Sequence, residues 1–165
     1  GSYWQRHGIE APAPSPQDIR RAARLARSGR PETLPWQTCR DALAGLGEPS
    51  EDIPDHVPRP GAREYPGHTG SPIDWPAKAL KAGVHGVPGG ENMIRMPDGT
   101  VRYFTVREAA RLMGLPDDWV FRGSWSRSLR QLGNAVPVPL ARAFGAAMMG
   151  QILAGKGKLS RNRAA

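Results

Sequence analysis

Prolines recur throughout the segment 47–76, and they constrain the fold of this chain more than any other feature. Proline lacks the backbone N–H that helices and central strands require, so we expect a long ordered loop or linker here. Across 165 residues the chain has 20 glycines, 17 prolines and only 7% aromatic residues, which favours a small core and much irregular backbone. The length predicts one domain, or a compact domain with an appended piece.

Three helix starts are marked by a capping hydroxyl followed three positions later by an acid. The pairs are Ser15 with Asp18, Thr38 with Asp41, and Thr105 with Glu108. Glycines at 29 and 114 predict the ends of the first and third helices. We expect the second helix within 38–46, a fourth at about 125–132, and a last one from Pro137 or Pro139 to about Ala154. The last helix should carry its apolar residues on one face.

The segment 92–105, "NMIRMPDGTVRYFT", predicts a β-hairpin because alternating stretches flank the turn-forming pair Asp98-Gly99. Residues 77–83 are a further strand candidate. Residues 3–14 are rich in proline and alanine, so we expect an extended lead. Gly1-Ser2 has the appearance of a cloning remnant.

A net charge of +8 favours a polyanionic partner, because bound phosphates release counterions. Nucleic acid is the first candidate, and the alternative is that the charge serves only solubility. Arginines 20, 21, 24 and 27 cover most of the polar surface of the first predicted helix. They could lie on phosphates or simply face water.

The single cysteine, Cys39, cannot form an internal disulfide, and the four histidines are scattered. We therefore expect a reducing, cytoplasmic setting, bacterial or phage-like, without a metal or a membrane partner. No apolar run is expected to reach the length of a membrane span. Cys39 lies near a predicted helix start, which can activate a thiol, but no acid or base pattern accompanies it, so a buried thiol is favoured.

Two blocks near the end, "FTVREAARLMGLPDDWVF" (104–121) and "QLGNAVPVP" (131–139), together resemble motifs IX and X of the cytosine-5 DNA methyltransferases. Residues 75–94 are similar to the recognition part of that family's target-recognition domain, and residues 36–49 to its beginning. The resemblance implies an α+β fold, with a small irregular target-recognition domain of short strands and a hairpin. It also implies C-terminal helices that pack on a separate Rossmann-like methyltransferase domain.

The resemblance divides the chain into three parts. Residues 1–14 form the lead, residues 15–123 the target-recognition domain with motif IX, and residues 124–165 motif X, a docking helix and a basic tail. The family's catalytic Pro-Cys, Glu-Asn-Val and glycine-rich cofactor segments have no counterpart in these 165 residues. Glu91-Asn92 echoes the catalytic pair, but Met93 follows it. The resemblance thus implies a chain that is inactive alone and needs a catalytic half carrying the nucleophilic cysteine.

In the family, the region matching 81–92 lies in the DNA major groove. Implied base-reading residues are His85, Glu91, Asn92 and Arg95, with Lys78 and Lys81 suited to phosphates. The full DNA-binding set is Lys78, Lys81, His85, Gly86, Gly89, Gly90, Glu91, Asn92 and Arg95. The alternative is an ordinary glycine-rich loop. The family usually has threonine where Ala79 stands, which puts one contact to the DNA backbone in doubt, and Val138 replaces a motif X proline.

The turn at Asn134, Ala135 and Val136 matches family positions that contact S-adenosylmethionine, the implied cofactor. Thr105, Arg107 and Glu108 are expected to be structural, through a cap and an ion pair. The tryptophans at 75, 119 and 125 could stack on bases, although packing is the favoured use.

The leading hypothesis is a chain that recognises double-stranded DNA and completes the S-adenosylmethionine pocket of a cytosine-5 methyltransferase, as a split-enzyme subunit or a fragment. The alternative is a stand-alone, non-catalytic DNA-binding or regulatory module derived from that family. An independent enzyme that uses Cys39 is the remote third hypothesis.

Overall fold

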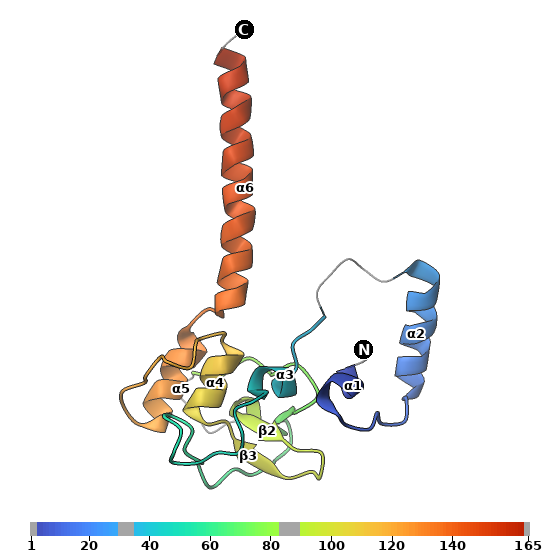
Figure 1. Cartoon of the computed structure of the whole chain (residues 1–165), viewed down its shortest axis with the longest axis vertical. Coiled ribbons are helices and arrows are strands. Elements are labelled where there is room, and N and C mark those ends of the chain that lie inside the picture. The colour runs from blue at the N-terminus through green and yellow to red at the C-terminus, as the bar shows by residue number, and fades with distance from the viewer. Residues whose placement is uncertain (1–2, 30–34, 83–89, 164–165) are drawn as a thin grey trace. The chain divides into compact units, whose positions relative to one another are not determined.

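The computed structural model describes residues 3–29, 35–82 and 90–163 of a mixed α/β chain. Two compact units are present, 1–35 and 36–165. Figure 1 shows the helices of both units and the small sheet of the second.

The first unit contains α1 (Tyr3–His7) and α2 (Pro16–Ser28), and neither helix has a buried residue. The extended lead predicted for residues 3–14 is wrong over α1. There, Tyr3 contacts His7 one turn later, with ring centroids 4.8 Å apart, a spacing that supports a helical turn. The cap predicted for α2 is present, because Ser15 Oγ accepts from Asp18 N at 3.2 Å and Ser15 N donates to the Asp18 carboxylate at 3.0 Å.

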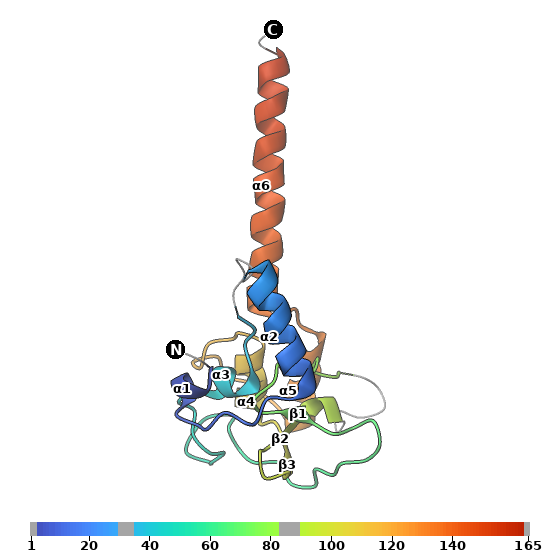
Figure 2. The ribbon, with the colours of Figure 1, turned by 90° about the vertical axis from the view of Figure 1, so that its right-hand side faces the viewer.

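The second unit has a three-stranded sheet in the order β1-β2-β3, built from β1 (Ser71–Pro72), β2 (Met93–Arg95) and β3 (Val101–Tyr103). β2 and β3 form the antiparallel hairpin that the sequence predicted. The Asp98 carboxylate closes its turn by accepting from Thr100 N at 2.9 Å and Thr100 Oγ1 at 2.7 Å. Figure 2 shows the three strands beneath the helices of this unit.

β1 lies inside the proline-rich segment and was not predicted. It pairs in parallel with β2, and Pro72 is tolerated because β1 is an edge strand. The strand predicted for residues 77–83 is wrong for 77–82, while 83 lies outside the described residues. In place of a ladder, side chains bind this backbone: Lys78 N donates to Ser71 Oγ and Lys81 N to Asn92 Oδ1, each at 3.0 Å.

The helices of the second unit are α3 (Cys39–Leu43), α4 (Val106–Leu112), α5 (Trp125–Asn134) and α6 (Val138–Arg163). The capping boxes predicted for α3 and α4 are both present. Gly114, at φ 75°, ends α4, with its N–H donating to Arg111 O and that of Leu115 to Ala110 O, as in a Schellman motif. α3, α4 and α5 pack around one core, whose buried members are Cys39, Ile73, Ile94, Phe104, Val106, Ala109, Ala110, Met113, Leu129 and Leu132.

Buried polar side chains fasten the long loop of residues 47–69 to α4. His56 is fully buried, with Nδ1 2.8 Å from Thr105 Oγ1 and Nε2 3.3 Å from Gly47 O. Thr105 therefore caps α4 and also holds the loop. The Glu108 carboxylate binds Arg102 through two contacts of 2.7 Å.

Arg107 is the largest buried side chain of the described residues. Its guanidinium donates to three backbone carbonyls and pairs with Asp55, whose Oδ2 is 3.4 Å away. The carbonyls belong to Pro54, Pro116 and Trp119, at 3.0 to 3.3 Å. Asp55 has a positive φ of 65°, a strained conformation that the bonds to its side chain and carbonyl accommodate.

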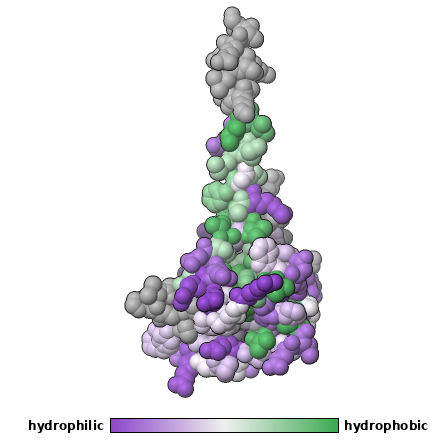
Figure 3. Space-filling view, turned by 90° about the vertical axis from the view of Figure 1, so that its left-hand side faces the viewer, coloured by the Kyte–Doolittle hydropathy of each residue, from purple (hydrophilic) through white to green (hydrophobic). Residues whose placement is uncertain are grey.

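α6 extends to Arg163, beyond the predicted end near Ala154. The prediction of one apolar face is also wrong, because Met149 and Leu153 place exposed apolar side chains opposite Leu140 and Phe144. Figure 3 shows apolar side chains over the described surface of α6.

By length and composition alone, the stretch Trp125–Ala154 could cross a membrane, where the sequence predicted no such run. It is not one continuous helix, however. α5 ends at Asn134, Ala135 is extended (φ −82°, ψ 155°), and α6 begins at Val138.

Candidate functional site

The predicted recognition segment leads into the short helix η1 (Gly90–Asn92) and then β2. His85, Gly86 and Gly89 lie outside the described residues, and Gly90 begins η1. Asn92 is fully buried. Its carboxamide accepts from Lys81 N and donates to Lys81 O, both at 3.0 Å, an arrangement that favours a clamp on the loop over base readout.

Glu91 lies between two basic side chains, with Oε1 3.6 Å from Lys81 Nζ and Oε2 3.5 Å from His68 Nδ1. A hydrogen bond from its own backbone N–H and the charges of Lys81 and His68 lower the pKa of Glu91, so it is an anion at neutral pH. His68 also stacks on Tyr65, with ring centroids 4.3 Å apart. This pairing of Glu91 with His68 was not predicted, because residues 23 positions apart meet only in the folded chain.

Three further residues that the sequence analysis singled out lie in the described parts of this region. Lys78 is exposed and its Nζ lies 3.3 Å from Thr69 Oγ1. Arg95, at the end of β2, is half-buried and forms no ion pair within the described parts of the chain. Ala79 is exposed, and its methyl group cannot supply the hydrogen bond of the family's usual threonine.

Gly133, in α5, packs against the start of this segment at Lys81 and Ala82. A Cβ at position 133 would lie 2.8 Å from Ala82 N and 3.0 Å from Lys81 C, closer than packed atoms tolerate. Glycine therefore permits the start of the recognition segment to lie directly on α5. The structure brings together two stretches that the sequence singled out separately, 81–92 and 131–139.

The predicted cofactor turn follows immediately. Asn134, Ala135 and Val136 are all exposed, and Ala135 N donates to Leu132 O at 3.1 Å. Within the described residues, the Asn134 carboxamide has no hydrogen-bond partner, so its donor and acceptor groups remain available.

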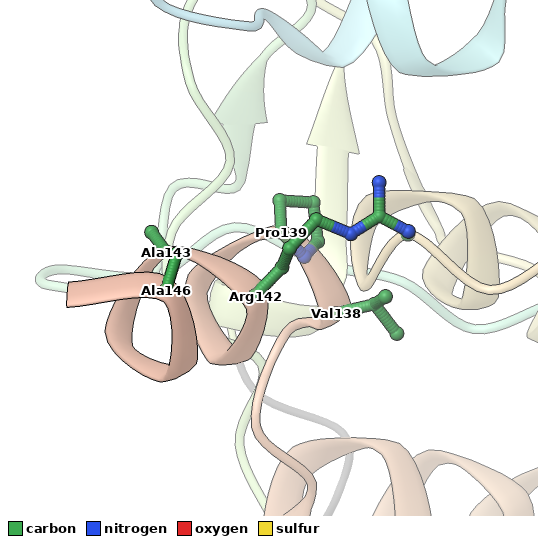
Figure 4. Close-up of a pocket in the computed structure, with 6 residues that line it drawn as sticks. Val138, Pro139, Arg142, Ala143 and Ala146 are labelled. Atoms are coloured by element: carbon green, nitrogen blue, oxygen red, sulfur yellow. The ribbon is translucent and has the colours of Figure 1, made fainter. Parts of the chain in front are cut away.

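The chain then returns to α4. Val138 N donates to Met113 O at 2.8 Å, and Gly114 leaves room for Pro139, whose ring would lie 2.6 Å from a Cβ there. The first turns of α6 line a shallow apolar depression of about 360 Å³, shown in Figure 4. Its lining residues are Gly114, Val138, Pro139, Arg142, Ala143 and Ala146.

Cys39 is fully buried in the core. Burial raises the pKa of its thiol to about 12, which keeps the sulfur protonated and unreactive. Of the three tryptophans considered for base stacking, Trp125 donates Nε1–H to Phe104 O at 2.9 Å and contacts Tyr103, which is a packing role. Trp75 and Trp119 are exposed. Among described residues, no group of three or more His, Cys, Asp or Glu side chains could hold a metal ion.

Comparison with known proteins finds the C-5 cytosine-specific DNA methylase family over residues 60–150, more than half of the chain. The type II methyltransferase M.AplI of Arthrospira platensis is 40% identical over 73 residues, 44% of this chain and 21% of its own length. DNA (cytosine-5)-methyltransferase CMT2 of Oryza sativa is 53% identical over 47 residues, 28% of this chain and 4% of its own length.

The type II methyltransferase M.Sau96I of Staphylococcus aureus is 47% identical over 53 residues, 32% of this chain and 12% of its own length. The chain thus spans about a fifth, or less, of the curated relatives that it matches. The matched segment contains the hairpin, α4, α5 and the turn before α6. By this match, the chain belongs to the C-5 cytosine-specific DNA methylase family.

Proposed function

We propose that this chain supplies DNA target recognition and one wall of the S-adenosylmethionine pocket to a cytosine-5 DNA methyltransferase. The catalytic cysteine comes from residues outside these 165, either on a separate subunit or elsewhere in a longer protein. The observation that carries the proposal is the contact at Gly133, because it links a segment suited to DNA with the turn suited to the cofactor.

DNA recognition is supported by the charges around residues 78–95. Lys78 and Lys81 are exposed cations suited to phosphates. Arg95 can present a guanidinium fork to guanine, and Glu91, held ionised, can accept from the amino group of cytosine. The burial of Asn92 supports a different role, in which it fixes the loop backbone while its neighbours contact the bases.

The fit to S-adenosylmethionine rests on the exposed turn after α5. The Asn134 carboxamide offers its NH2 group as donor and its oxygen as acceptor to a polar ligand, and the nearby Val136 offers an exposed apolar side chain. These groups form one wall only, and the remaining walls belong to the proposed Rossmann-like domain. When bound there, the cofactor supplies the methyl group.

α6 is proposed to dock on that domain. Its large apolar side chains, among them Leu140, Phe144 and Met148, are exposed, and an apolar surface of this kind marks an interface. The proposal keeps the domain division expected from the sequence, with 15–123 for recognition and 124–165 for the cofactor turn and docking, although α5 packs on the core of the recognition part.

A reconstitution assay tests this proposal. Transfer of labelled methyl groups to unmethylated duplex DNA is measured with this chain alone, with a separately expressed catalytic half that carries the Pro-Cys loop, and with both. We expect methyl transfer in the mixture only. DNA binding without association with the catalytic half would instead favour the stand-alone regulatory module, and transfer by the chain alone would contradict both.

The cofactor wall has its own test in the active mixture. Asn134→Ala should weaken S-adenosylmethionine binding about fivefold, the effect of one hydrogen bond worth about 1 kcal/mol. Gln131→Ala, an exposed change one turn earlier on α5, is the matched control. Equal affinity in both variants would refute the placement of this turn.

A further inference from the structure

α2 carries a basic face that the family comparison does not describe, because the matched region begins at residue 60. At 3.6 residues per turn, Arg20, Arg21, Arg24 and Arg27 fall within about 120° of the helix circumference. Gln17, Arg20, Arg21 and Arg24 line a shallow depression on this face. The opposite side carries Ile19 and three alanines, so α2 is amphipathic.

Among the described residues of the first unit, no carboxylate forms an ion pair with an arginine of α2. Asp18, the only acid of the helix, accepts hydrogen bonds from Ser15 Oγ and Ser15 N in the cap. These bonds, with a smaller contribution from the charge of Arg21, lower the pKa of Asp18. Arg27 Nε donates to Ala23 O at 3.3 Å. No arginine of α2 forms an ion pair among the described residues, and no residue of α2 is buried.

We propose that this arginine face binds phosphates of duplex DNA without regard to sequence. All four cations are arginines, whose forked guanidinium matches phosphate oxygens. Arg20 and Arg27 are about 10 Å apart along the helix, so the face can follow several phosphates of one strand. A basic stripe along one helix is the expected electrostatic footprint of nucleic-acid binding.

A lipid surface fits α2 less well. Helices that lie in membrane interfaces bury tryptophan, phenylalanine or leucine on their apolar side. The apolar side of α2 consists of Ile19 and small alanines, and the only leucine, Leu25, lies away from its centre. The apolar area that α2 could insert is therefore small.

The inference rests on the proposed DNA-binding function, and a salt titration tests both. Binding of the full chain to an arbitrary 30-base-pair duplex is measured by fluorescence anisotropy over a series of NaCl concentrations. The triple variant Arg20→Gln, Arg24→Gln, Arg27→Gln should reduce the slope of log K against log salt by about 0.9 for each lost phosphate contact, close to 2.7 in total. Glutamine keeps the helix propensity, which circular dichroism verifies.

Two matched variants complete the design. Lysine at the same three positions should retain most of the slope. The second variant replaces three exposed arginines of the second unit with glutamine, at Arg122, Arg130 and Arg142. It removes the same charge and should change the slope of log K against log salt far less. Equal decreases in both glutamine variants would overturn the inference, because they would reflect net charge alone.

The remaining outcomes separate the inference from the proposed function. An unchanged slope in the α2 variant, together with weaker DNA binding by Lys78→Gln, overturns the inference and leaves target recognition standing. Absence of any duplex binding by the unaltered chain overturns both. If vesicles containing phosphatidylserine bind the chain through these arginines while the DNA slope stays unchanged, the face belongs to lipid and the inference is wrong.

Discussion

Two phenylalanines of the second unit differ sharply in burial. Phe104, between the sheet and α4, is fully buried, whereas Phe144 on α6 is 63% exposed. Around Phe104, apolar side chains have a common core, and Arg107, His56 and Thr105 have hydrogen-bond partners within the unit. Around Phe144, the apolar side chains of α6 are exposed, among them Leu140 and Met148. The described residues of 36–132, here called the body, thus share a core of their own, whereas the large apolar side chains of α6 stay exposed, as the proposed docking on another surface requires.

The largest expected effect on stability is in the body. Arg107→Ala removes a buried guanidinium, which deprives the Asp55 carboxylate of its cation and three carbonyls of the hydrogen bonds from this side chain. We expect a loss of about 3–5 kcal/mol in the free energy of unfolding. Urea unfolding measures this loss. The free energy of unfolding of the exposed variant Arg142→Ala on α6 should stay within about 0.5 kcal/mol of that of the unaltered chain. Similar losses of stability in both variants would contradict the difference between the body and α6.

Glycine substitutions sharpen the same contrast. Gly133→Ala places a methyl group 2.8 Å from Ala82 N and should destabilise the body by about 1–3 kcal/mol. Gly145→Ala in α6 meets open space and should increase helicity, since alanine is favoured by up to about 1 kcal/mol. Urea unfolding and circular dichroism read out both changes. A tolerated Gly133→Ala would mean that residues 81–82 do not lie on α5.

Alkaline pH should weaken the body through Cys39. Burial raises the folded-state pKa from 9.0 to about 12, so the unfolded chain loses this proton first. The contribution of the neutral thiol is complete below about pH 9 and is lost as the pH rises toward 12. At pH 10 the loss should be about 1.4 kcal/mol. Cys39→Ala should lack this extra decline, and parallel pH profiles of the two proteins would contradict the burial of the thiol.

The smallest effect on stability is expected in α6. Phe144→Gln should change the free energy of unfolding of the body by less than about 0.5 kcal/mol, because the side chain is exposed. The same variant should weaken co-purification with the catalytic half, and Gln151→Ala serves as a polar control on α6. A large shift in the urea midpoint would show that α6 supports the body.

Local chemistry made much of the fold predictable. Each of the three capping boxes is complete within four residues, and the hairpin turn at Asp98-Gly99 depends only on its neighbours. The contacts missed from the sequence are distant ones. His56 reaches Thr105 across 49 positions and Arg107 reaches Asp55 across 52, and β1 forms only because β2 lies beside it.

The same limit applies to the candidate site. Residue types marked the recognition segment and the turn at Asn134, and the structure joins them through Gly133. Asn92 has the chemistry of a base-reading residue, and only its burial indicates a clamp. The exposure of α6 was expected on the basis of a missing partner surface, but the spread of apolar residues around the whole helix was not.

Hydrogen exchange on the chain, with and without the catalytic half, tests the central claim most directly. For the chain alone, the amides of the body around α4 should be protected and those along α6 should exchange quickly, because the described side chains of that helix are exposed up to residue 154. Adding the catalytic half should protect 134–154 strongly and leave residues 103–113 unchanged. Unchanged exchange along α6 in a mixture that transfers methyl groups would contradict the account.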